Sequence, residues 1–204
     1  MRRTPQRPRI WESRTCCRAA IVTGCESDSM LALGIDLAAQ PSNTGAVFLE
    51  SAGEPWRAFE LEEVPTNDAL IGAARRADVL GVDAPFGWPI DFVEAVSAHG
   101  AFEGWPGGEN RERLTHRETD RAVQERSSLH PLSVSADKLG STAMRCALLQ
   151  RRWADEVWDG RRAERDGSDW LVETYPAAAL RQWGMQSKGY KNGKGDAPMV
   201  RRRP

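Results

Sequence analysis

The sequence predicts a single α/β domain built on a mixed five-stranded sheet, with strand order 3-2-1-4-5 and helices flanking the sheet. Two observations predict this fold class. Three short apolar segments separated only by turns come first, and such segments are typical of antiparallel neighbours. The later apolar segments alternate with helical ones, which is typical of parallel strands joined by crossovers. The length of 204 residues suffices for one domain with its own hydrophobic core.

The first half of the domain is expected to hold four strands and one helix. Apolar residues alternate with smaller ones in the first segment, as in a buried strand, and a polar turn at residues 38–44 follows it. Thr66 stands where a helix cap is expected. The expected elements are strands at residues 31–36, 45–49, 56–61 and 79–83 and a helix at residues 69–77.

The second half is expected to be mainly helical. Pro85 and Pro89 enclose a rigid turn after the fourth strand, and residues 100–108 are expected to form a loop. Pro176 stands near the first turn of the last helix, where proline is tolerated. The expected elements are helices at residues 90–99, 115–125, 141–158 and 175–183 and a strand at residues 170–173.

The domain is expected to span residues 30–187. Residues 1–29 are basic and show no hydrophobic period, which indicates a disordered extension or, because Met30 directly precedes the first strand, an annotation artefact. A nucleic-acid-binding arm is the remaining alternative for this segment. Residues 188–204 show no amphipathic period and end on three arginines and a proline, so we expect an irregular basic tail.

The most informative feature is a carboxylate at the end of each of three strands. This element order has the layout of a ribonuclease H-like sheet, in which the strand ending at Asp36 is central and lies beside the strand ending at Asp83. Glu173 ends the last strand. Like charges gather at such density when a cation or a shared proton lies between them. The three acids therefore predict a site for Mg²⁺ or Mn²⁺, and two such ions can clamp both sides of a phosphodiester during in-line attack.

Four motifs carry a resemblance to a known family. Residues 34–38, 81–87, 117–120 and 173–177 together resemble domain-of-unknown-function family 429, over roughly residues 31 to 191. The resemblance implies a ribonuclease H fold, nuclease activity and functional acids at Asp36, Asp83 and Glu173. Family members continue after a segment like residues 188–191 into a further helix. In this chain the residues after 191 show no amphipathic period that would predict such a helix. We therefore expect a truncation or frameshift, which would remove one metal ligand and leave the enzyme inactive or unstable.

Four further residues are candidates for substrate binding. Arg117 and Asp120 fall within one helical turn of each other and are expected to reach the scissile phosphate; the alternative is a surface ion pair of little energetic value. Ser42 could donate a hydrogen bond to a phosphate, or serve as an ordinary turn residue. Lys138 could contact a nucleic-acid backbone, or be merely solvated.

Tryptophan and histidine give weaker signals. Trp88 and Trp105 could each stack a base, although a proline-flanked tryptophan is more often part of a core or a loop anchor. His116 and His130 lack partners at the spacing of a metal site or a catalytic triad, so both are predicted to be structural.

Three function classes remain open. The leading prediction is a metal-dependent nuclease that acts on RNA or DNA. The first alternative is a single-domain relative of the actin-like and sugar-kinase ATPases, because residues 34–45 resemble their phosphate-binding turn. The second is a non-catalytic domain that binds nucleic acid or a partner protein.

The composition indicates where in the cell the protein is expected, but it does not identify a binding partner. A formal net charge of −1 predicts neither nucleic acid nor membrane as a partner. No apolar run approaches the length of a membrane span, and the basic start lacks the apolar core of a secretion signal, so a cytoplasmic protein is expected. The sequence does not set the oligomeric state.

Overall fold

A computed structural model describes residues 29–51, 55–164 and 168–187 of the chain. The predicted N-terminal extension (apart from residue 29) and the predicted basic tail lie outside these ranges, so both stay predictions. The strands are β1 (Met30–Asp36), β2 (Gly45–Ser51), β3 (Arg57–Glu60), β4 (Val79–Asp83) and β5 (Leu171–Glu173). The helices are α1 (Asn67–Ala74), α2 (Ile90–Gly100), α3 (Arg111–Thr115), α4 (Glu118–Ser127), α5 (Gly140–Glu156) and α6 (Pro176–Gln182), with short 3-10 turns at Pro41–Asn43 and Gly108–Asn110.

The five strands form one mixed sheet in the order β3-β2-β1-β4-β5. The pairs β1–β2 and β2–β3 are antiparallel, whereas β1–β4 and β4–β5 are parallel. This confirms the predicted strand order and gives the domain a ribonuclease H-like topology. The central β1 adjoins one antiparallel and one parallel neighbour, so its carboxyl end meets that of β4 at the same edge of the sheet.

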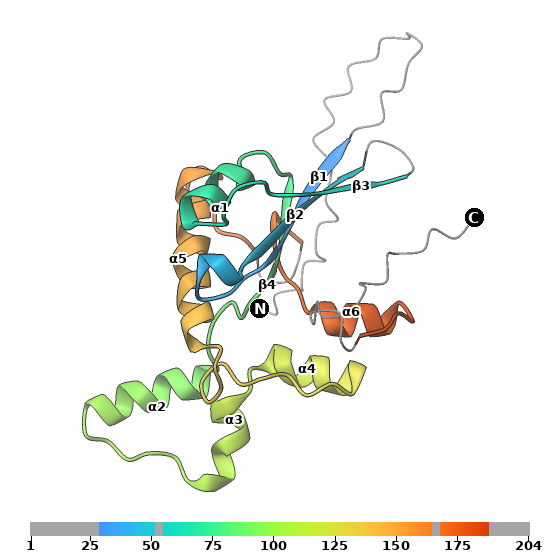
Figure 1. Ribbon diagram of the computed structural model, residues 1–204. Helices are drawn as coiled ribbons and strands as arrows, with labels where there is room; N and C mark the ends of the chain where they lie inside the picture. Colours follow the sequence, from blue (N-terminus) through green and yellow to red (C-terminus); the bar gives the residue numbers. More distant parts are fainter. Residues whose placement is uncertain (1–28, 52–54, 165–167, 188–204) are drawn as a thin grey trace, which may run out of the picture.

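The core lies between one face of the sheet and the helices α1 and α5. Alternating residues of the strands supply the sheet side of the core, and α5 contributes the fully buried Trp153 together with Leu149 and Cys146. Figure 1 shows α1 and α5 side by side along the sheet. Burial of alternate strand residues is what fixes the register, because a one-residue slip would expose the whole apolar set.

The helices α2, α3, α4 and α6 are arranged differently from the core helices α1 and α5. In Figure 1, α2, α3 and α4 lie beyond the carboxyl end of β4, and α6 runs beside α4. Among the described helices, none combines the length and apolar character that crossing a membrane requires.

The prediction was wrong at the start of the third predicted helix. Instead of one helix at residues 115–125, a five-residue α3 ends at Thr115 and α4 begins at Glu118. The carboxylate of Asp120 accepts a hydrogen bond of 2.9 Å from the backbone N–H of Arg117, and this local cap sets the start of α4. The short, polar α3 has no apolar period long enough to predict it.

Candidate active site at the carboxyl ends of the central strands

Asp36 and Asp83 are register partners at the ends of two parallel strands. Their Cα atoms are paired in the β1–β4 ladder. Side chains at paired positions point to the same face of a sheet, and this face is opposite to the buried one, because the preceding partners Ile35 and Val82 belong to the core. Backbone pairing alone therefore brings two carboxylates together.

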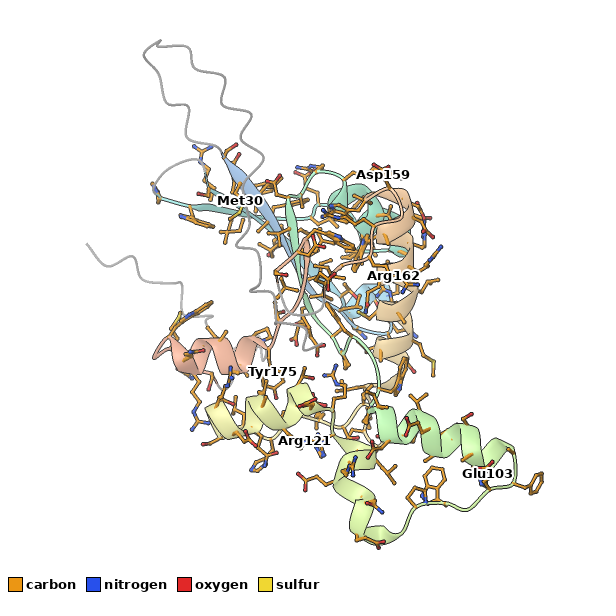
Figure 2. The ribbon with its side chains drawn as sticks, turned by 180° about the vertical axis from the view of Figure 1, so that it is seen from behind. Met30, Glu103, Arg121, Asp159, Arg162 and Tyr175 are labelled. Atoms are coloured by element: carbon orange, nitrogen blue, oxygen red, sulfur yellow. The ribbon has the colours of Figure 1, made fainter. Side chains whose placement is uncertain are left out.

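Both aspartates line a cavity of about 290 Å³ at this end of the sheet. Other walls of the cavity come from the loop after β4, the start of α5 and the segment that joins β5 to α6. Figure 2 labels Tyr175, which stands at this last position and also lines the cavity. The charged side chains lining it are Asp36, Asp83, Asp120, Glu173 and Arg117.

Five of the seven predicted site residues thus line one cavity, and two do not. Ser42 lies in the exposed 3-10 turn after β1, and Lys138 is exposed just before α5. Neither belongs to the cavity wall. Their substrate-binding roles stay predictions.

Glu173 reaches the cavity from a different register position. It pairs with Val82 and not with Asp83, so its side chain leaves the sheet on the face opposite to that of the aspartates. Its carboxylate is held by donors: Oε1 accepts from Arg117 Nη2 at 2.7 Å, and Oε2 accepts from Arg117 Nη1 at 2.9 Å and from the backbone N–H of Phe86 at 3.1 Å. This forked pairing directs both oxygens toward the guanidinium.

Arg117 joins two carboxylates across the site. Besides Glu173, it binds Asp120 through Nη2–Oδ1 at 2.7 Å and Nε–Oδ2 at 3.0 Å. The Arg117 side chain is only 14% exposed and that of Asp120 only 8%. Burial by itself lowers the pKa of Arg117, but hydrogen bonds from the guanidinium to Asp120 and Glu173 and their charges outweigh it, so the pKa is raised. The guanidinium is therefore a permanent cation in this wall.

The carboxylates do not form a compact ligand cage. Within residues 29–51, 55–164 and 168–187, no group of three or more His, Cys, Asp or Glu side chains could hold a metal ion. The structure pairs Asp36 with Asp83 in the β1–β4 register, whereas Glu173 forms an ion pair with Arg117. The physical reason is the one-residue offset of the β4–β5 register combined with the competing guanidinium. The predicted ligand role of Glu173 stays a prediction.

A buried arginine that the sequence analysis missed secures the turn after Asp36. Arg145 of α5 donates to Ala38 O, Thr44 Oγ1 and Pro65 O, each at 2.7 Å, and to Asn67 Oδ1 at 2.8 Å. It is 9% exposed, and burial lowers its pKa. The signal in the sequence was a charged residue at a position that the helical period assigns to the buried face of α5.

The chain matches one known family. No curated protein and no solved structure matches it. The family model described as "Protein of unknown function (DUF429)" matches residues 34–203, and the chain belongs to that family.

Proposed function

Starting from this family membership and the paired aspartates, we propose that the protein is a divalent-metal-dependent hydrolase of phosphodiester bonds in RNA or DNA. The observation that carries the proposal is the pairing of Asp36 with Asp83 at the ends of two adjacent parallel strands, on one face and in one cavity. Open α/β sheets bind ligands at such carboxyl ends.

The donor set suits Mg²⁺ or Mn²⁺. Magnesium is commonly bound by one or two carboxylates, and its remaining ligands are waters and substrate phosphate oxygens. Asp36 and Asp83 supply such a pair, and a cation between them would offset their mutual repulsion. The pair suits a single ion better than the two ions expected from the sequence. A bound ion would activate a water molecule and neutralise charge on the phosphate.

The charge of the cavity also supports a metal requirement. Four carboxylates and one guanidinium line the cavity. An anionic phosphodiester would be repelled by such a wall unless a cation were present. Arg117 holds Asp120 and Glu173 in fixed positions, with four of its five N–H donors engaged. We assign it to shaping the cavity and reducing its negative charge.

The test combines metal binding with cleavage. Mn²⁺ binding is measured by calorimetry, and cleavage of fluorescent single-stranded, duplex and RNA–DNA hybrid oligonucleotides is measured in Mn²⁺ and in EDTA. We expect metal-dependent cleavage by the parent, and a loss of about 100-fold or more in Asp36→Asn and Asp83→Asn, since even outer-shell changes at metal sites cost about 10–100-fold.

The matched control is Glu60→Gln, which changes an exposed carboxylate on the edge strand β3. It should bind metal and cleave like the parent. Cleavage that persists in EDTA, or a parent chain that neither binds Mn²⁺ nor cleaves, would refute the proposal. An ATP arm tests the alternative class: a rise in melting temperature with ATP, without cleavage, would support the ATPase-like reading instead.

A further inference from the structure

A second cavity lies directly behind the wall of the first. Its volume is about 410 Å³, and it is lined by residues 86–91 after β4 and by residues of α3 and α4. Arg117 and Glu173 line both cavities, so their ion pair forms the shared wall. Figure 2 shows the labelled Arg121 on α4, at the same end of the sheet as Tyr175.

Most charges of the second cavity are already paired, but Arg121 is an exception. Arg113 binds Asp91 at 2.7 Å, as Arg117 binds Glu173. Arg121 donates from Nη1 to the backbone carbonyl of His116 at 2.9 Å, and no carboxylate in the described part of the chain lies within ion-pair distance of it. Its remaining N–H donors are thus available to an anion.

Two neighbouring groups in the cavity also lack partners. The indole N–H of the half-buried Trp88 has no hydrogen-bond acceptor among the residues that the structure describes. The ring of His116 contacts the Thr115 hydroxyl through Nδ1 at 3.0 Å. Within the described ranges, Nε2 of the same ring has no hydrogen-bond partner.

We propose that this second cavity is a substrate subsite, which holds the nucleotide adjacent to the phosphodiester in the first cavity. Trp88 stacks the base, and Arg121 binds the phosphate. The inference rests on the proposed function, and it specifies that the substrate is a nucleic-acid strand and not an isolated nucleotide. Stacking on an aromatic ring tolerates every base, and guanidinium donors suit phosphate oxygens.

The size and position of the cavity fit this role. Its volume falls in the range of small-molecule sites, about 300–1,000 Å³. A strand that occupies both cavities would cross the Arg117–Glu173 pair, where the guanidinium offsets part of the carboxylate charge. Glu118 also lines the second cavity, and no cation within residues 29–51, 55–164 and 168–187 pairs with it. It should weaken phosphate binding, which gives the test a substitution of opposite sign.

The test measures binding of a fluorescein-labelled single-stranded oligonucleotide by fluorescence anisotropy. EDTA is present so that no metal ion contributes to binding or cleavage. We expect Arg121→Gln and Trp88→Leu each to weaken binding about tenfold. Arg121→Gln should also reduce the salt slope of log K by about 0.7, the value for one contact with a single strand. Glu118→Gln should tighten binding. The matched control is Arg126→Gln, an exposed arginine on the same helix that does not line the cavity.

Several outcomes would overturn the subsite. One is an Arg121→Gln variant that binds like the parent, and another is an equal loss in Arg126→Gln. A mononucleotide or inorganic phosphate that binds as tightly as the oligonucleotide would show a site for free nucleotides instead. The two proposals fail separately. Metal-dependent cleavage with unchanged binding in both subsite variants removes only the subsite, whereas weakened binding in them without any metal-dependent cleavage removes only the hydrolase.

Discussion

Replacing Arg145 by methionine tests whether the turn after Asp36 depends on one buried guanidinium. The substitution keeps a long side chain but removes four donated hydrogen bonds, to Ala38 O, Thr44 Oγ1, Pro65 O and Asn67 Oδ1. These acceptors belong to the β1–β2 turn and to the entry into α1. The variant therefore leaves Pro65 O and Asn67 Oδ1 without this donor, whereas Thr44 Oγ1 still accepts from the backbone N–H of Ala38.

The expected loss in free energy of unfolding is about 3 kcal/mol. Each hydrogen bond from a charged donor contributes about 1.5–3 kcal/mol, but the buried cation itself costs several kcal/mol of desolvation, which the variant recovers. The lowered pKa of Arg145 has this same desolvation as its cause. For a chain of this size, about 3 kcal/mol corresponds to a fall of about 6–12 °C in melting temperature.

Thermal and urea unfolding followed by circular dichroism measure the effect. The matched control is Arg151→Met on the same helix, where the arginine is 73% exposed and pairs with Asp155 at the surface. This control should change stability by about 0.5 kcal/mol or less. A loss below about 1 kcal/mol for Arg145→Met, or an equal loss for both variants, would refute the reasoning. Mn²⁺ affinity should fall as well, since Ala38 lies two residues after Asp36.

Three further predictions concern the ion pairs and the metal. Arg117→Gln should destabilise the fold by about 3–5 kcal/mol in urea unfolding, because it leaves the buried carboxylate of Asp120 and the half-buried carboxylate of Glu173 without their cation. Arg113→Gln at the exposed pair should be nearly neutral. The hydrogen bond from Arg152 lowers the pKa of Glu156, so this pair stabilises the fold above the ordinary glutamate pKa and the contribution disappears as pH falls through the lowered value. The free energy of unfolding of Glu156→Gln should therefore vary less with pH below about 4.5 than that of the parent. High salt should reduce this difference between variant and parent. Mn²⁺ at about 100 times its dissociation constant should stabilise the parent by about 2.7 kcal/mol and leave Asp83→Asn unchanged.

The strand order could be predicted because each strand carries its own local signal. Alternation identifies a half-buried strand, and turns or helices between strands decide antiparallel or parallel pairing. Asp36 and Asp83 followed from this order, since both are last in parallel neighbours that end together. The pairing of these two carboxylates needed no knowledge of side-chain packing.

The position of Glu173 needed information that the sequence pattern does not hold. In the three-residue β5, register depends on how Leu171 packs into the core, and a shift of one residue reverses the face on which every side chain lies. The competing partner Arg117 is 56 residues away in sequence. The local hydrophobic periodicity predicts neither the β4–β5 register nor the pairing of Glu173 with Arg117.

The segment between β4 and α5 was the least predictable, and it builds the wall between the cavities. Its helix α4 is polar, with Asp120 as its buried residue, so capping contributes more to its start than apolar packing does. Asp120 caps the helix through the backbone N–H of Arg117, and the same carboxylate binds the guanidinium that holds Glu173. The local contact with Asp120 therefore holds the Arg117 guanidinium in the position from which it binds Glu173. Because one side chain serves both the helix start and the strand end, a substitution at Asp120 should loosen the wall of both cavities together.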